Sequence, residues 1–241
     1  MKEYLHRIFP GSKEDFIKHI NLSLISGKRE FVVTANPEIL MKAENDSYIR
    51  EFLLDGSGKV TIVPDGISVV KVMQRQGIPV TERITGVDIT EKLLETAGKN
   101  NLSVYLLGAS QEVVSRLAKQ EKLKYPKAVY HFHNGYDGDK DSIFEEIKIL
   151  QPDLIIVALG VPAQEKLIYK HFNDFSKGVF IGVGGSFDVL SGSKRRAPRF
   201  FVQTNTEWLY RILREPSRIK RFYESNVKFM RHSRRDSFEK N

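Results

Sequence analysis

The chain of 241 residues contains no cysteine, which excludes disulfides, thiolate metal sites and cysteine nucleophiles. Long apolar runs are also missing, and no stretch approaches the roughly 20 apolar residues that a membrane-spanning helix needs. The opening residues, MKEYLHRIFPGSKED, lack the apolar segment of a secretory signal. With 41% hydrophobic and 28% charged residues, the sequence is typical of a globular protein with one sizeable core. We therefore expect an enzyme-sized protein of the cytoplasm.

The positive charge is confined to one part of the chain. The formal net charge is +8, and the segment from Lys194 to Asn241 holds 14 of the 38 Lys and Arg but only 5 of the 30 Asp and Glu. The other residues, 24 basic and 25 acidic, nearly balance. Such a polarised distribution indicates an anionic partner, which is a nucleic acid, a phosphate-bearing substrate or an anionic membrane surface.

Short β-rich runs alternate with helical patterns along the first four fifths of the chain. Strands are expected at 31–34, 60–64, 103–108, 128–133, 153–160 and 178–184. Helices are expected at 13–26, 37–54 with a break near 45–46, 66–76, 88–100, 110–124, 141–150 and 163–174. Strands separated by helices of this length predict an α/β fold, in which a mostly parallel sheet is flanked by helices.

The composition changes after Gly192, where SGSKRRAP interrupts the alternation. Two basic helices are expected beyond it, at 199–214 and 216–232, parted at Pro216. The second mixes apolar and basic residues, so it either lies on a membrane surface or packs on the domain with a solvated basic face. We divide the chain into a core, residues 1–195 with parts of about 1–100 and 101–195, and a basic helical C-terminal appendage, residues 196–241.

Ligands of a parallel sheet bind beyond the carboxyl ends of its strands. Asp65 directly follows one expected strand, where it either caps the next helix or faces a cleft as a general base. Thr34 ends another strand and lies near Asp65 if the two strands are neighbours. Asn36 then suits the cap of a helix that begins at Pro37.

Three further loops carry candidate residues. Ser110 caps a helix whose free N–H groups suit a phosphate, although a plain capped turn is the better explanation of this residue. The glycine-rich segment after residue 182 lets backbone approach a ligand closely. The candidates in these loops are Gly108, Ala109, Ser110, Gly160, Pro162, Gln164, Glu165, Gly184, Gly185 and Asp188. Neither a P-loop nor a complete G-x-G-x-x-G follows any strand.

Two patterns suggest a metal site and are better explained otherwise. His131 and His133 lie on one face of an expected strand, but no third ligand lies near them in the sequence. Asp137 and Asp139 form a D-x-D within a loop rich in turn residues, which favours a solvated turn. We expect no metal and no cofactor.

Nine short motifs occur in an order that resembles one protein family. They are TANPE (34–38), PDG (64–66), RITGVD (83–88), LGA (107–109), NGY (134–136), ALGVPAQE (158–165), GVGGSFD (182–188), RAP (196–198) and EWLYR (207–211). The ordered set, spread over about residues 30–222, is similar to the WecG/TagA/CpsF glycosyltransferases, and most similar to the branch that begins wall teichoic acid linkage units.

The resemblance implies a Rossmann-like core, a helical appendage and metal-independent, inverting sugar transfer. N-acetylmannosamine would pass from UDP-ManNAc to the 4-hydroxyl of GlcNAc on undecaprenyl diphosphate. The alternative is another UDP-sugar donor, of the ManNAc-uronate or glucose type, in capsule, exopolysaccharide or common-antigen assembly. The family also implies a homo-oligomer that sits peripherally on the cytoplasmic face of the plasma membrane.

Residue roles are implied by matching positions. Asp65 would be the general base, and Thr34 and Asn36 would position a sugar beside it. Arg83 and Gln164 would bind the sugar-diphosphate region. The glycine loops named above would admit the nucleotide, together with Asn134 and Tyr136. Without a metal, the leaving UDP or the lipid diphosphate would be stabilised by cations from the appendage, namely Arg211, Arg214, Arg218 and Arg221.

Two other function classes remain as alternatives. Basic and aromatic residues interleave in the appendage, as in nucleic-acid-binding segments. The core, however, is nearly neutral and contains no nucleic-acid module, so we expect no nucleic-acid partner. A nicotinamide-dependent oxidoreductase would suit a Rossmann-like core but lacks the glycine fingerprint.

Overall fold

The computed structural model describes residues 2–238, with the side chains of residues 3–217 and 219–233. Its centre is a six-stranded sheet in which every pairing is parallel. The strands are β1 (Glu30–Ala35), β2 (Val60–Pro64), β3 (Ser103–Gly108), β4 (Val129–His133), β5 (Leu154–Ala158) and β6 (Val179–Gly182), in the order β2-β1-β6-β5-β3-β4. All six expected strands are confirmed, and so is the α/β fold with flanking helices.

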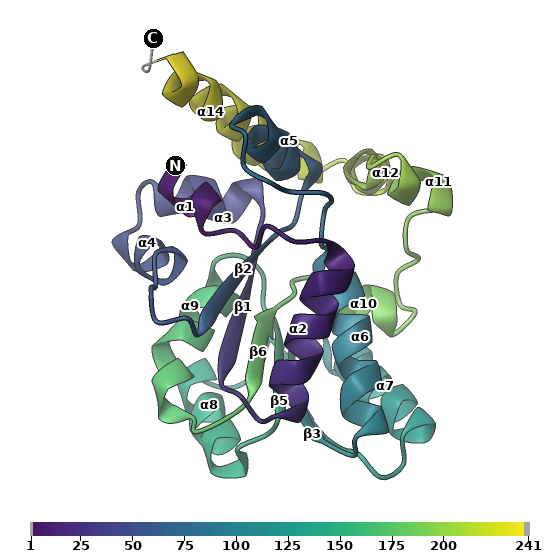
Figure 1. Cartoon of the computed structure of the whole chain (residues 1–241). Coiled ribbons are helices and arrows are strands. Elements are labelled where there is room, and N and C mark those ends of the chain that lie inside the picture. Colours follow the sequence, from purple (N-terminus) through teal and green to yellow (C-terminus); the bar gives the residue numbers. More distant parts are fainter. Residues whose placement is uncertain (1, 239–241) are drawn as a thin grey trace.

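Helices cover both faces of the sheet, giving three layers (Figure 1). One face carries α2 (Lys13–Ile25), α6 (Gly86–Lys99), α7 (Gln111–Lys124) and α10 (Ser186–Leu190). The other carries α1 (Lys2–His6), α3 (Pro37–Ala43), α4 (Ser47–Leu53), α5 (Ile67–Arg75), α8 (Lys140–Leu150) and α9 (Ala163–His171), which a 3₁₀ turn, η1 (Phe172–Asp174), follows. Two buried cores result, because alternate residues of a strand point to opposite faces. In β1, Val32 contributes to the first core, and Phe31 and Val33 to the second.

The expected helices of the core are present, including the break in 37–54. There, α3 ends at Ala43 and Asp46 caps α4 by accepting from the backbone N–H groups of Tyr48 and Ile49. Two short helices were not predicted, α1 and α10. Each has only five residues, which is too short to reveal a helical period in the sequence.

The appendage differs from its expected form. The segment 199–214 is two helices, α11 (Arg199–Gln203) and α12 (Glu207–Arg214), rather than one. Asn205 between them has a φ of 56°, and this left-handed residue ends α11. The segment expected at 216–232 comprises α13 (Arg218–Phe222), a π-helical turn η2 (Tyr223–Val227) and α14 (Lys228–Phe238). No helix of residues 2–238 is long and apolar enough to cross a membrane.

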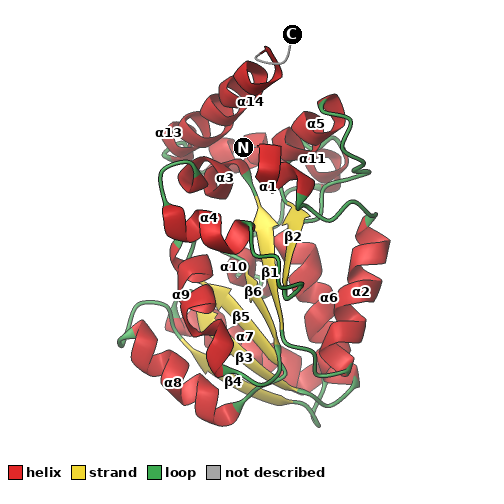
Figure 2. Cartoon of the chain, turned by 60° about the vertical axis from the view of Figure 1, so that its left-hand side comes forward, coloured by secondary structure: helices red, strands yellow, loops and turns green. Residues whose placement is uncertain are grey.

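The appendage folds back over the carboxyl ends of the strands (Figure 2). Helix α14 packs on α3 and α5, and η2 also packs on α3. Phe229 is completely buried and belongs to the same core as the β1 side chain Phe31. Arg196 of the connecting segment pairs with Asp88 of α6 at 2.5 Å. The appendage therefore covers the carboxyl ends of strands, where ligands of parallel sheets bind.

Candidate active site

A pocket of about 150 Å³ lies at the ends of β1, β2 and β6, beneath α12. Its lining combines loops of the core with the first turns of three helices. The lining residues are Thr34, Asp65, Arg83, Thr85, Gly86, Val87, Val183, Gly185, Ser186, Glu207, Trp208 and Arg211. The structure thus brings together five residues that the sequence singled out from distant segments, namely Thr34, Asp65, Arg83, Gly185 and Arg211.

Strand pairing positions Asp65 in this pocket. Thr34 lies opposite Val63 in the parallel pair of β1 and β2, so both strands end at the same level. The backbone N–H of Asp65 donates to the Ala35 carbonyl at 2.9 Å, which extends the pairing by one residue. Gly66 then turns the chain with a φ of 130°, a conformation that favours glycine. The Asp65 carboxyl is left pointing at the pocket rather than capping α5, whose first residue has no side-chain cap.

Asp65 holds its proton more tightly than an ordinary aspartate. Desolvation by the surrounding protein raises the pKa of its carboxyl from 3.8 to about 6. The positive charges of Arg83 and Arg211 lower this pKa, while the negative charges of Glu207 and Asp88 raise it. A carboxylate with a pKa near 6 is ionised at neutral pH and still basic enough to accept a proton from a hydroxyl as a bond forms.

Glu207 and Trp208 of α12 line the pocket and were not among the sequence candidates. Glu207 is 5% exposed and pairs with Arg83 at 3.1 Å and with Arg211 at 2.5 Å. Trp208 lines the pocket and stacks on Phe222 of α13, with ring centroids 4.5 Å apart. The EWLYR motif contains both residues, but nothing in the sequence distinguishes a pocket carboxylate there from a solvated one.

Gln164 connects two glycine loops from within the protein. Its Oε1 accepts from the backbone N–H of Gly160 at 3.0 Å and of Gly184 at 2.9 Å, and its Nε2 donates to Glu165 at 2.7 Å. The side chain is 1% exposed, so its contacts in this structure hold the loops after β5 and β6 together. Burial raises the pKa of Glu165 to about 7, and its Oε2 has no hydrogen-bond partner.

The loops after β3 and β4 also lie at the carboxyl ends of the strands, but apart from the Asp65 pocket. Gly108 has a φ of 129°, and a Cβ there would lie 2.4 Å from the Ala158 carbonyl oxygen, so only glycine fits. Ala109 follows with a φ of 57°, and Ser110 caps α7. Asn134 is buried and accepts from two backbone N–H groups of its own turn, while Tyr136 is 81% exposed. None of these residues lines the pocket around Asp65.

A second cleft, of about 430 Å³, lies between α3, α4 and the appendage. Arg221 lines it and pairs with Glu38 of α3 at 2.8 Å, and Pro162 and Lys228 lie on its walls. Asn36 caps α3 by accepting from two backbone N–H groups. The remaining sequence candidates lie elsewhere: Asp188 in α10 one turn after Gly185, and Arg214 on the exposed end of α12. Arg218 begins α13, but its side chain lies outside the described residues.

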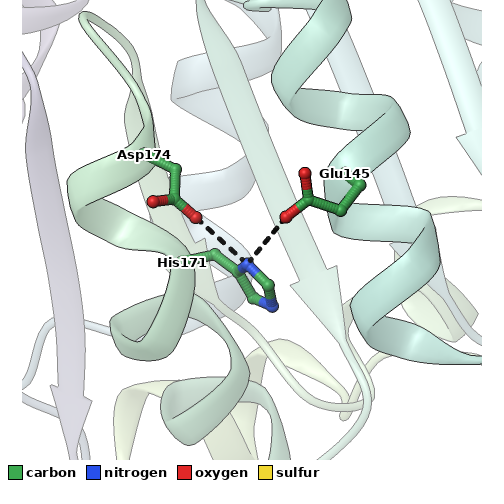
Figure 3. Close-up of side chains that lie close together, drawn as sticks. All are labelled: Glu145, His171 and Asp174. Atoms are coloured by element: carbon green, nitrogen blue, oxygen red, sulfur yellow. Dashed lines mark hydrogen bonds and ion pairs between the residues drawn. The ribbon is translucent and has the colours of Figure 1, made fainter.

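The side chains of the suggested metal patterns have other partners. His131 stacks on Tyr105, and Asp139 caps α8. Among the described residues, ligand atoms converge instead at Glu145, His171 and Asp174, within 4.8 Å of one another (Figure 3). Both ring nitrogens of His171 already contact carboxylates. Nδ1 lies 3.3 Å from Asp174 and 3.9 Å from Glu145, and Nε2 lies 2.7 Å from Asp141. This cluster braces α8 against the end of α9 that lies away from Asp65.

Comparisons with known proteins agree with the motifs. The sequence model of the Glycosyl transferase WecG/TagA/CpsF family matches residues 5–241. A protein of Staphylococcus aureus (strain MW2) named N-acetylglucosaminyldiphosphoundecaprenol N-acetyl-beta-D-mannosaminyltransferase is 40% identical over 192 residues, 79% of this chain and 74% of the relative. A protein of the same name from Bacillus spizizenii is 37% identical over 208 residues, 86% of this chain and 80% of the relative. The chain therefore belongs to the WecG/TagA/CpsF family of glycosyltransferases.

Proposed function

We propose that this glycosyltransferase moves N-acetylmannosamine from UDP-ManNAc to the 4-hydroxyl of GlcNAc on undecaprenyl diphosphate. Two relatives that share 37–40% of its residues over most of both chains carry the name of that activity. The observation that carries the proposal to this chain is Asp65, a carboxylate with a pKa of about 6 in a pocket that also holds two arginines.

Asp65 acts as the general base. It accepts the proton of the acceptor hydroxyl while the hydroxyl oxygen forms a bond to the anomeric carbon of the donor sugar. The bond from that carbon to the UDP oxygen breaks on the opposite face, and its electron pair leaves with UDP. Direct displacement inverts the anomeric centre, so that an α-linked donor yields a β-1,4-linked disaccharide. The proton on Asp65 then passes to solvent.

Charge on the leaving UDP is balanced by the chain's own cations. Arg83 and Arg211 line the pocket with Asp65, and Arg221 lines the neighbouring cleft. Guanidinium groups that are already held in place stabilise developing charge without the reorganisation that water must undergo. This arrangement supports the expected independence from metal ions. Arg214, on the exposed end of α12, extends this cationic surface for the lipid diphosphate, and Arg218 follows it in the sequence.

The appendage also suits the acceptor's location at a membrane. Several large apolar side chains of α11 to η2 are exposed: Phe200, Leu209, Leu213, Ile219 and Tyr223. Exposed apolar groups among basic ones bind anionic bilayers. We propose that the appendage contacts the cytoplasmic face of the membrane, peripherally, while the pocket receives the lipid-linked sugar. We also propose that the enzyme forms a homo-oligomer, as the family resemblance implies.

A transfer assay tests the activity directly. The full chain is incubated with EDTA, a short-chain lipid diphosphate–GlcNAc acceptor and UDP-ManNAc, UDP-GlcNAc or UDP-Glc in parallel. We expect product from UDP-ManNAc alone and at least a thousandfold less from Asp65→Asn, a change that leaves UDP binding intact. Product from another donor would move the enzyme to capsule, exopolysaccharide or common-antigen assembly. No product from any of these donors or a ManNAc-uronate donor would refute the proposal.

A further inference from the structure

The carboxylate of Glu207 bridges two arginines that come from different parts of the chain. Oε2 lies 3.1 Å from Nη2 of Arg83, which belongs to the core segment before α6, and Oε1 lies 2.5 Å from Nη2 of Arg211 in α12. The side chain of Glu207 is only 7% exposed and that of Arg83 13%. Glu207 is the first residue of α12, and no step of the proposed reaction uses it.

We propose that Glu207 is a positioning residue, which holds Arg83 and Arg211 at the Asp65 pocket and fastens α12 to the core. This proposal rests on the proposed function in taking the Asp65 pocket as the active site; the two ion pairs of Glu207 are independent of that function. Glu207 is not one of the five sequence candidates that line this pocket, and its two ion pairs explain how an appendage helix is held at a pocket of the core.

Electrostatics require such a carboxylate. Two guanidinium groups that share one partly buried pocket repel each other, and a desolvated cation without a partner is costly. One carboxylate with two oxygens can accept from both and fix both orientations. Apart from this bridge, α12 packs mainly on its neighbours α11 and α13 within the appendage. Removing the bridge would therefore free α12 and Arg211 from the pocket.

Glu207 also contributes to the charge that Asp65 experiences. The groups that act on Asp65 are the cations Arg83 and Arg211 and the anions Glu207 and Asp88. Asp88 is itself paired, with Lys13 at 2.7 Å and Arg196 at 2.5 Å. Neutralising Glu207 while both arginines stay in place removes one negative neighbour, so the pKa of Asp65 falls. Losing Arg211 instead removes a positive neighbour, so the pKa rises.

The experiment is the pH profile of kcat/KM for the full chain and for Glu207→Gln, which keeps the size of the side chain and removes its charge. We expect the acid limb to move to higher pH, because both arginines leave Asp65 when the carboxylate that holds them is neutralised, and kcat at pH 8 to fall about 10- to 100-fold as they lose orientation. Arg211→Gln should move the limb to higher pH. The matched control is Glu215→Gln, which removes the exposed pair of the same appendage with Lys194 (3.1 Å) and should move neither quantity.

A second measurement does not depend on transfer. The Asp65 carboxyl is titrated by NMR in protein labelled with ¹³C-aspartate, and the resonance is assigned from its loss in Asp65→Asn. Both variants, Glu207→Gln and Arg211→Gln, should raise the midpoint of this titration, even if the donor proposed above proves wrong. The same midpoint in wild type and Glu207→Gln, together with an unchanged kcat, would overturn the assignment. A Glu207→Gln midpoint that falls would also overturn it, because both arginines would then have stayed beside Asp65 without Glu207.

Discussion

Replacing Asp65 by asparagine is expected to make the protein more stable at pH 8 while abolishing sugar transfer. Desolvation raises the pKa of this carboxyl to about 6, so the folded protein holds an ionised group where the neutral form is preferred. Asparagine has nearly the same shape and carries no charge. The substitution therefore removes the cost of keeping a base in a desolvated pocket, a cost typical of active sites.

The magnitude follows from proton linkage. Between pH 4 and 6 the folded state retains a proton that the unfolded state has lost, so the free energy of unfolding falls as the pH rises through this window. A pKa raised from 3.8 to about 6 corresponds to at most about 3 kcal/mol above pH 6. For a chain of this size, that gain raises Tm by about 6–12 °C. The advantage of the variant should shrink to nearly nothing at pH 4.

Urea unfolding of both proteins at pH 8, 6 and 4.5 measures the difference. The control is Asp139→Asn, at the cap of α8, where hydrogen bonds from the backbone and hydroxyl of Ser142 lower the pKa of the carboxyl. The control should gain no stability at pH 8. If Asp65→Asn is no more stable than wild type at pH 8, or if its advantage is the same at pH 4.5, then desolvation does not govern the Asp65 carboxyl and the argument for its basicity fails.

Three further outcomes follow from the structure. Gln164→Ala leaves the N–H groups of Gly160 and Gly184 without their partner and should lower the free energy of unfolding in urea by about 2–4 kcal/mol. The KM for the donor should also rise, and an unchanged KM would show that these two loops do not contact the donor. Burial would raise the pKa of Glu30, but hydrogen bonds from Ser23, Thr61 and His19 outweigh it and lower the pKa. Glu30→Gln should therefore lose about 1–3 kcal/mol at pH 7, and the loss should fade as the pH drops below about 4.5, which thermal unfolding across pH would detect. Deleting residues 196–241 should abolish both vesicle sedimentation and transfer; full transfer by the truncated chain would show that its arginines are dispensable.

The fold was predictable from the sequence because the central strands of the sheet are buried on both faces. Strands such as β5, LIIVA, are apolar throughout and are separated by amphipathic helices, a pattern with few alternatives. The break between α3 and α4 was predictable for a local reason, since Asp46 caps the second helix. The break in 199–214 was not predicted; it lies at Asn205, whose left-handed φ of 56° follows the end of α11.

The sequence by itself determined the family, the class of fold, the candidate base Asp65 and the concentration of cations in the appendage. These depend on local order, composition and motifs. Only the tertiary structure decided which candidates meet. It brought Glu207 to Arg83 across 124 residues, and it turned Gln164 inward to hold two loops. Such contacts are set by packing of the appendage against the sheet edge, and no local pattern of charge or hydropathy encodes them.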